Sequence, residues 1–247
     1  MSALDAALDA ALTELCTRRP LMLASDYDGV LAPLVGDPSA AVPEPGVAAV
    51  LARLAALPGV TVAVVSGRGV EDLQTTSGLS GPFRWIGSHG AEFDGPLPSA
   101  LAARRDALAE QLRPMVAGVP GARLEVKPAA VAVHVRQVSD RAAAAALLAR
   151  VDAATDPSLT KKPGKEVLEL AVTDADKGSA LRRLRAELGP AAVMYLGDDV
   201  TDEDAFRTLA DGDLGVKIGD GETAATLRIP DPAAAVALLR RLADLLA

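Results

Sequence analysis

The chain has 247 residues, of which 50% are hydrophobic but only 2% aromatic, and its formal net charge is −8. This acidic balance, without a basic stretch, argues against a nucleic-acid partner, and the absence of an apolar run of about 18 residues argues against a membrane span. The single cysteine, Cys16, excludes an internal disulfide and a Cys-based zinc cluster. Because the N-terminus also lacks the basic start of a signal peptide, a soluble cytoplasmic protein is expected.

The first part of the chain predicts alternating helices and parallel strands. Apolar residues at helical spacing predict a helix over residues 3–18, and the apolar run 21–23 predicts a buried strand that leads to Asp26. A loop rich in Pro and Gly follows, then a helix over 47–57 and a second buried strand over 60–65. A strand, helix and strand of these lengths predict a right-handed parallel unit.

Two carboxylates stand at the end of the first strand. Asp26 and Asp28 are two positions apart, so at a strand end both side chains can face one site, and Gly29 then allows a sharp turn. Two carboxylates held side by side repel each other unless a cation or a proton lies between them. The pair is therefore either an acidic turn or the centre of a cation-assisted site.

The second strand ends at Ser66-Gly67-Arg68. Ser66 could be the N-cap of the next helix, or its hydroxyl could bind a phosphate oxygen beside exposed backbone N–H groups. A short strand over 84–87 leads into a glycine-punctuated loop over 88–92. His89 and Gly90 in that loop could line the same cleft or be ordinary loop residues.

The middle of the chain predicts a separate α+β unit. A helix is expected over 99–116, two alternating strands over 123–127 and 131–136 with a turn at 128–130, a helix over 140–154, and a strand over 167–170 after the segment 161–165. One face of these strands would carry four charged or polar side chains, Glu125, Lys127, His134 and Arg136. The face is either solvated or lies over a cleft and binds hydroxyl groups.

The parallel core resumes near residue 174. Lys177, at the start of a helix over 179–188, is either an exposed first-turn residue or an ammonium that anchors a phosphate. A buried strand over 192–196 ends in an acidic turn over 197–202, and ligands bind at the carboxyl ends of such strands. Asp26, Asp28 and Asp198 would supply the oxygen ligands that Mg²⁺ prefers. A last short strand over 214–218 and a closing helix over 233–246 complete the expected core.

Four motifs stand in order, each after a strand or at a helix start. They are Asp26-x-Asp28-Gly29, Ser66-Gly67-Arg68, Asp176-Lys177-Gly178 and Gly197-Asp198-Asp199-x-x-Asp202. This set resembles the motifs of haloacid dehalogenase-like (HAD) phosphatases. The resemblance implies an α/β fold in which residues 1–96 and 174–247 form a Rossmann-like parallel-sheet core and residues 97–173 form an inserted α+β cap of type 2.

Within that superfamily, the chain is similar to the trehalose-6-phosphate phosphatases. The similarity rests on Ser25-Asp26-Tyr27-Asp28-Gly29, the loop 87–92, the cap segments 125–127, 134–136 and 164–169, and the acidic segment 197–204. Relatives often carry Tyr where this chain has Val135, and Arg-Pro where it has Ala171-Val172. The alternatives are another sugar-phosphate phosphatase or a phosphosugar mutase, for instance acting on sucrose or mannosyl phosphates, or a phosphosugar-binding regulator without turnover.

The resemblance also implies roles for individual residues. Asp26 would be the nucleophile that forms an aspartyl-phosphate, Asp28 the general acid and base, and Mg²⁺ would be held by Asp26, the Asp28 carbonyl and Asp198. Ser66 and Lys177 would position the phosphoryl group, and Asp199 and Asp202 would support the site. Substrate would also contact the following residues: Gly67, Arg68, His89, Gly90, Glu125, Lys127, His134, Arg136, Lys165 and Glu169. The expected partner is a small sugar phosphate, and a monomer is expected.

Overall fold

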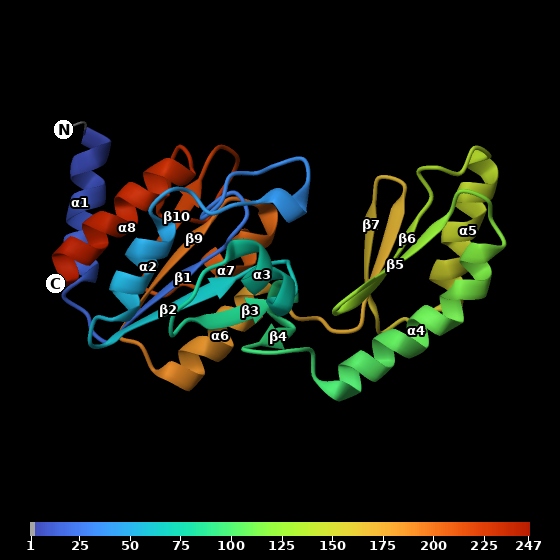
Figure 1. Cartoon of the computed structure of the whole chain (residues 1–247), viewed down its shortest axis with the longest axis horizontal. Coiled ribbons are helices and arrows are strands. Elements are labelled where there is room, and N and C mark those ends of the chain that lie inside the picture. Colours follow the sequence, from blue (N-terminus) through green and yellow to red (C-terminus); the bar gives the residue numbers. More distant parts are fainter. Residues whose placement is uncertain (1–2) are drawn as a thin grey trace. The chain divides into compact units, whose positions relative to one another are not determined.

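A computed structural model describes residues 3–247 of the chain (Figure 1). The chain divides into two compact units, which we name the core unit and the inserted unit. The core unit consists of the described part of residues 1–95 together with residues 175–247, and the inserted unit consists of residues 96–174. Each unit has its own sheet.

The core unit is built on a seven-stranded sheet in the order β11-β10-β9-β1-β2-β3-β4. The strands are β1 (Leu21–Ser25), β2 (Val60–Val65), β3 (Arg84–Gly87), β4 (Glu92–Phe93), β9 (Ala192–Gly197), β10 (Leu214–Ile218) and β11 (Leu227–Ile229). All neighbouring strands run parallel except the pair β3 and β4. Because β1 lies between β2 and β9, the carboxyl ends of these three strands meet at one edge of the sheet.

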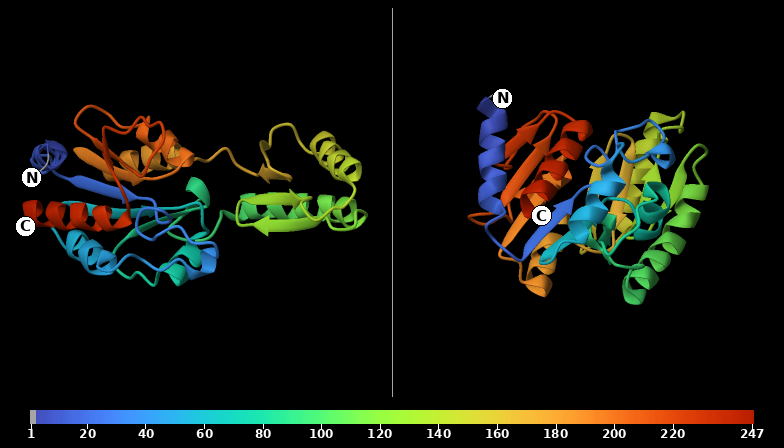
Figure 2. Two further views of the ribbon diagram at one scale, coloured as in Figure 1. Left: turned by 90° about the horizontal axis from the view of Figure 1, so that it is seen from above. Right: turned by 60° about the vertical axis from the view of Figure 1, so that its left-hand side comes forward.

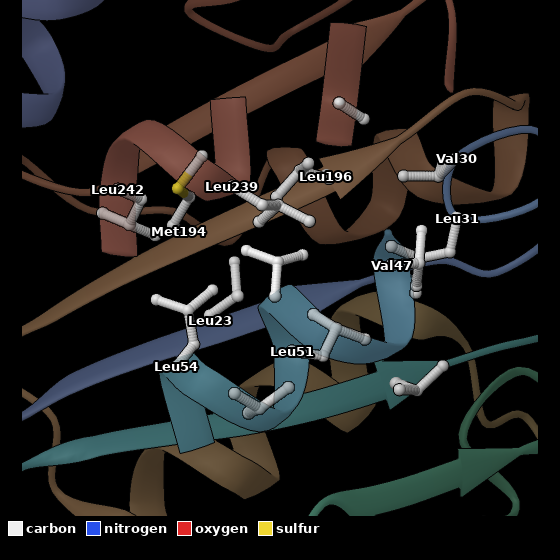
Figure 3. Close-up of a cluster of buried hydrophobic side chains, with 14 of the residues drawn as sticks. Leu23, Val30, Leu31, Val47, Leu51, Leu54, Met194, Leu196, Leu239 and Leu242 are labelled. Atoms are coloured by element: carbon white, nitrogen blue, oxygen red, sulfur yellow. The ribbon is translucent and has the colours of Figure 1, made fainter. Parts of the chain in front are cut away.

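Helices cover both faces of the core sheet (Figure 2). They are α1 (Ala3–Leu15), α2 (Val47–Ala55), α3 (Val70–Ser77), α6 (Lys177–Leu188), α7 (Glu203–Phe206) and α8 (Pro232–Leu246), with three short 3₁₀ turns η1 (Pro38–Ala40), η2 (Ser88–Gly90) and η3 (Val200–Asp202). Alternate side chains of β1 enter different clusters, because successive strand residues point to opposite faces. Leu23 packs with α2 and α8 (Figure 3), whereas Met22 and Ala24 pack with α6 and α7.

The inserted unit contains a four-stranded antiparallel sheet in the order β5-β6-β8-β7. Its elements are α4 (Ser99–Ala117), β5 (Arg123–Lys127), β6 (Ala130–His134), α5 (Arg141–Ala154), β7 (Thr160–Gly164) and β8 (Val167–Ala171). α4 lies against β5 and β6, and α5 lies against α4. Val131 and Val133 of β6 are completely buried, as are Leu112 of α4 and Val151 of α5, so this unit has its own apolar core.

The structure confirms the α/β class and corrects several of the predicted elements. The first helix ends at Leu15, three residues earlier than the pattern predicts. The segment that was expected to lead into β8 is itself a strand, β7, and the strand over 214–218 is followed by another, β11. β6 ends at His134, so Arg136 lies beyond the strand instead of on it. Across residues 3–247, none of the helices has the length and apolar character needed to cross a membrane.

Candidate active site

A buried ion pair joins the carboxyl end of β1 to the start of α6. The Lys177 ammonium donates to Asp26 Oδ2 at 2.5 Å, and the second oxygen of Asp26, Oδ1, accepts from the Tyr27 backbone N–H at 2.6 Å. Asp26 is 6% exposed and Lys177 is 2% exposed. The alternative that Lys177 is an exposed first-turn residue is therefore wrong. Its position follows from the N-cap of α6, where the Asp176 side chain accepts from the Ser179 N–H and starts the helix at Lys177.

Asp202 is completely buried and holds the other side of the ammonium. Its Oδ1 accepts from Lys177 at 2.8 Å and from the Tyr195 hydroxyl at 2.7 Å. Its Oδ2 accepts from the backbone N–H groups of Asp198 and Asp199, both at 3.0 Å. Burial raises the pKa of Tyr195, and the charge of Asp202 adds to the rise, so this hydroxyl remains a donor. A carboxylate offers about four lone-pair sites, and these four donors use them.

Asp26, Asp198 and Asp202 bring one carboxylate oxygen each within 4.8 Å of one another. Burial is the main cause that raises the pKa of Asp198 to about 6, with the charge of Asp202 adding to it, and burial likewise raises the pKa of Asp26. Although burial alone would lower the pKa of Lys177, the carboxylates of Asp26 and Asp202 raise it, so the ammonium stays charged. The cluster thus holds more negative charge than one ammonium offsets.

A divalent cation fits this excess of negative charge. The carboxylate of Asp202 already accepts four hydrogen bonds, so it has no acceptor site left for a cation. Asp26 and Asp198 still have carboxylate lone pairs that could bind one. Gly29 makes room for Asp198, because a Cβ at Gly29 would lie 2.0 Å from Asp198 Oδ2, and its φ of +76° also suits glycine. The residues present therefore fit the magnesium site that the sequence predicts, with Asp26 and Asp198 as the carboxylates that could bind the ion.

The second carboxylate of the first motif, Asp28, is held by Arg68. The guanidinium donates to both oxygens of Asp28, through Nε at 2.7 Å and Nη2 at 2.8 Å. It also donates to Asp72 at 3.1 Å and to the Pro38 carbonyl at 2.6 Å, and it lies over the Tyr27 ring. A two-pronged pair of this kind fixes the direction of the carboxylate. Arg68 was predicted to contact substrate, and in the structure its side chain contacts Asp28.

Ser66 lies at the end of β2 and is 1% exposed. Its hydroxyl oxygen accepts from the Arg68 N–H at 3.1 Å, and α3 begins instead after Gly69, so the alternative that Ser66 is the N-cap of that helix is wrong. The neighbouring loop is fixed by Glu92, a buried residue that the sequence interpretation did not single out. Glu92 accepts from the Ser88 hydroxyl at 2.7 Å and from the Val70 N–H at 3.3 Å.

His89 and Gly90 connect this loop to its surroundings. A Cβ on Gly67 would lie 2.6 Å from the His89 ring, so the imidazole rests on the backbone of Gly67. A Cβ on Gly90 would lie 2.7 Å from the Asp176 carbonyl, next to the start of α6. The two glycines therefore permit the turn η2 to pack closely against the loop that carries Ser66 on one side and against the start of α6 on the other.

Two further side chains near the site were missed at the sequence level. Tyr195 and Lys217 both interrupt apolar strands, where such residues are easily taken as packing. Lys217 is 4% exposed and donates to the Asp198 carbonyl at 2.5 Å, and it lies 3.9 Å from Glu203. The detectable signal was a lysine in the middle of the run 214–218, because a buried lysine needs a partner.

In the inserted unit, the strand register places Glu125, Lys127, His134 and Glu169 on one face of the sheet. His134 Nε2 and Glu125 Oε2 are 2.6 Å apart, and Lys127 donates to Glu169 at 2.5 Å. Ala132, completely buried, lies opposite Glu125 and Glu169 in the register and forms the floor between the two pairs. We name this surface, made of Glu125, Lys127, Ala132, His134 and Glu169, the polar face.

Other residues predicted to contact the sugar lie at or beyond the end of the polar face. Arg136 has a side chain that is 75% exposed, and its guanidinium is 3.8 Å from Glu166. Lys165 is exposed in the turn between β7 and β8. Lys162, which the sequence interpretation omitted, lies opposite Glu169 in the register and therefore shares its face. Ala171 lies on the same face, opposite Ala130, whereas Val135 and Val172 are buried.

Comparison with known proteins agrees with the geometry of the core unit. The sequence model of the family described as trehalose-phosphatase matches residues 24–226, which include all the residues placed above. The chain belongs to the trehalose-phosphatase family. The trehalose-phosphate phosphatase of Mycobacterium marinum is 36% identical over 239 residues, and that of Mycolicibacterium paratuberculosis is 38% identical over 242 residues.

For both of these trehalose-phosphatase relatives, the alignment covers 89% of this chain. The chain spans about three fifths of their length, 60% and 61% respectively. A solved structure of the trehalose-6-phosphate phosphatase of Aspergillus fumigatus superposes with a TM-score of 0.76 at 26% identity, covering 96% of this chain and 97% of that one. The fold of the trehalose-phosphatase family, a HAD-type α/β core with an inserted unit, is therefore the fold of this chain.

Proposed function

We propose that the chain is a Mg²⁺-dependent phosphatase that hydrolyses trehalose 6-phosphate to trehalose and phosphate. The observation that carries the proposal is the buried Lys177 ammonium, which joins Asp26 to Asp202 at the edge where Ser66 and Asp198 also lie. A phosphoryl group needs a fixed positive charge and a nucleophile at hydrogen-bond distance from each other, and Lys177 and Asp26 supply both. Membership of the trehalose-phosphatase family supports the choice of substrate.

The proposed reaction has two halves that share one aspartate. In the first, a carboxylate oxygen of Asp26 attacks phosphorus while the bond from phosphorus to the sugar oxygen breaks, and Asp28 gives its proton to that oxygen. In the second, Asp28 takes a proton from water, whose oxygen attacks phosphorus and releases phosphate and the Asp26 carboxylate. Trehalose leaves after the first half and phosphate after the second, and no other reactant is consumed.

The surrounding residues position these groups. Ser66 and Lys177 would hold oxygens of the phosphoryl group. Arg68 donates to both oxygens of Asp28 and fixes its direction, so it would have to release one of them for Asp28 to carry the proton that it donates. Asp26, Asp198 and the Asp28 carbonyl would hold Mg²⁺, which, when bound, offsets the negative charge of the phosphate and the nucleophile. The buried position of Asp26 keeps bulk water away from the attacking oxygen.

The polar face of the inserted unit is the proposed sugar-binding surface. Glu125 and Glu169 offer acceptors, while Lys127 and His134 offer donors, and the register brings all four side chains to one face. Lys165 and Arg136 would contribute from the loops at its end. Ala171 stands on this face where the family resemblance implies an arginine. This difference favours keeping one alternative, a phosphatase for another sugar phosphate such as sucrose phosphate or a mannosyl phosphate.

Phosphate release from a panel of substrates tests the proposal. The panel contains trehalose 6-phosphate, sucrose 6-phosphate, a mannosyl phosphate and an aryl phosphate, each with Mg²⁺ and with EDTA. Asp26→Asn serves as the inactive control, because an amide is a poor nucleophile, and turnover should fall by several orders of magnitude. The highest kcat/KM for another sugar would favour the alternative, and binding of a sugar phosphate without release would indicate a regulator.

A further inference from the structure

The Tyr195 hydroxyl lies inside the core unit, bound to the carboxylate that holds Lys177. Tyr195 is completely buried in β9, and its ring meets the Phe206 ring edge to face with centroids 5.5 Å apart. The strand fixes the backbone of Tyr195 and the packing fixes its ring, so the hydroxyl has a set position. The hydroxyl donates to Asp202 Oδ1 at 2.7 Å.

Asp202 Oδ1 accepts from two donors, the Lys177 ammonium and the Tyr195 hydroxyl. The Lys177 ammonium reaches it at 2.8 Å and reaches Asp26 at 2.5 Å, so the ammonium lies between two carboxylates that compete for it. The other oxygen of Asp202 is fixed by the N–H groups of Asp198 and Asp199. The Tyr195 hydroxyl is the second donor to Oδ1 and therefore restrains where this oxygen, and with it Lys177, can lie.

We propose that Tyr195 is a positioning residue of the phosphatase reaction, which acts through Asp202 to hold the Lys177 ammonium against Asp26. By occupying one lone pair of Oδ1, the hydroxyl weakens the pull of Asp202 on Lys177 and leaves the ammonium on the Asp26 side. Without it, the buried oxygen has an unfilled acceptor site, and Lys177 moves toward Asp202 to fill it. The inference rests on the proposed function, because Lys177 is useful against Asp26 only if Asp26 meets a phosphoryl group.

The alternative role for Tyr195 is structural, in which the hydroxyl only satisfies a buried carboxylate and contributes to stability. The two roles differ in what a missing hydroxyl changes. A structural hydroxyl would alter thermal stability and leave turnover by the folded protein unchanged. Loss of a positioning hydroxyl lowers kcat, because a displaced ammonium stabilises the transition state less. This loss disappears once Asp202 can no longer hold Lys177.

Tyr195→Phe, Asp202→Asn and the double variant test the inference as a double-mutant cycle. Tyr195→Phe keeps the ring contact with Phe206 and removes one oxygen atom. We expect kcat for trehalose 6-phosphate to fall roughly 10-fold, with KM changed less than about threefold, because one hydrogen bond to a charged group is lost. In the Asp202→Asn background, the same substitution should change kcat by less than about twofold.

Each measurement is made well below the thermal unfolding midpoint of the variant concerned, so that loss of fold does not contribute to the rates. A kcat of Tyr195→Phe within about twofold of wild type would overturn the inference, and so would equal losses with and without Asp202. An aryl phosphate serves as a second substrate, so the cycle does not depend on which sugar the enzyme accepts. A wild-type protein that releases phosphate from no compound would instead refute the proposed function.

Discussion

Replacing Lys177 with Met should strongly destabilise the core unit. The side chain is 2% exposed, and its ammonium contacts Asp26 at 2.5 Å and Asp202 at 2.8 Å, both carboxylates being buried. Methionine fills a similar volume but leaves two buried carboxylates without a counter-charge. Breaking a buried ion pair by removing one partner typically costs about 3–5 kcal/mol of unfolding free energy. We expect a loss in that range at pH 8 in the presence of EDTA.

The size of this loss should depend on pH in one direction. Burial already raises the pKa of Asp26, and without the ammonium the pKa of this carboxyl should rise further. The folded variant then binds more protons than the unfolded chain between the ordinary carboxyl pKa and the raised one, so its stability increases as pH falls. The difference from wild type should therefore be smaller at pH 5 than at pH 8.

Urea unfolding followed by Trp85 fluorescence measures this effect. Trp85 is the single tryptophan of the chain and lies buried in β3, so it reports on the core unit. Asp244→Asn is the matched control, because it breaks an ion pair between Asp244 and Arg53, two side chains that are about half exposed. It should lower the unfolding free energy by less than about 1 kcal/mol. A loss for Lys177→Met no larger than that of the control, or a loss equal at both pH values, would refute the reasoning.

Three other predictions concern activity and the metal. Asp28→Asn should reduce hydrolysis of trehalose 6-phosphate by roughly 10²–10⁴-fold and that of an aryl phosphate, a better leaving group, by less; equal losses in the first half-reaction would contradict a general acid. Glu169→Ala should lower kcat/KM for trehalose 6-phosphate roughly 10- to 100-fold and leave kcat/KM for the aryl phosphate unchanged. The control Glu110→Ala, at an exposed position, should change neither value. An equal drop on both substrates for Glu169→Ala would exclude a specificity role. Mg²⁺ should raise the unfolding temperature of wild type, and calorimetry should show that Asp198→Asn loses both the rise and the heat of binding.

The edge of the core unit that carries the candidate site was predictable because parallel strands end together. Asp26 follows β1, Ser66 follows β2 and Asp198 follows β9, and these strands are neighbours in the sheet. Order along the chain and the rule for strand ends were sufficient to bring them to one edge. The sequence did not decide whether Lys177 is an exposed first-turn residue or an ammonium that anchors a phosphate. The start of a helix can face water or the core with the same local sequence.

β7 and the role of Tyr195 were missed for different physical reasons. β7 contains Lys161, Lys162, Pro163 and Gly164, a segment that was expected only to lead into the next strand. It can be a strand because an edge strand tolerates proline, since one side of it has no partner. Tyr195 stands in an apolar run that predicts a buried strand, and nothing in that run indicates that its hydroxyl meets Asp202. Contacts of this kind depend on distant segments, so the local pattern contains no signal for them.

The order in which the ribosome delivers these segments has a consequence for how the protein matures. The contact between Lys177 and Asp26 joins positions 151 residues apart, and β1 cannot gain its second neighbour until β9 has been synthesised. Until then, β1 and β2 present an apolar edge with unpaired N–H and C=O groups, the kind of edge that invites aggregation. The inserted unit, whose sheet and apolar core come from residues 96–174 alone, emerges during this interval. A chain truncated shortly before residue 192 and released from the ribosome would therefore contain all of the inserted unit together with a core unit that lacks β9, and its open β1 edge would favour aggregation.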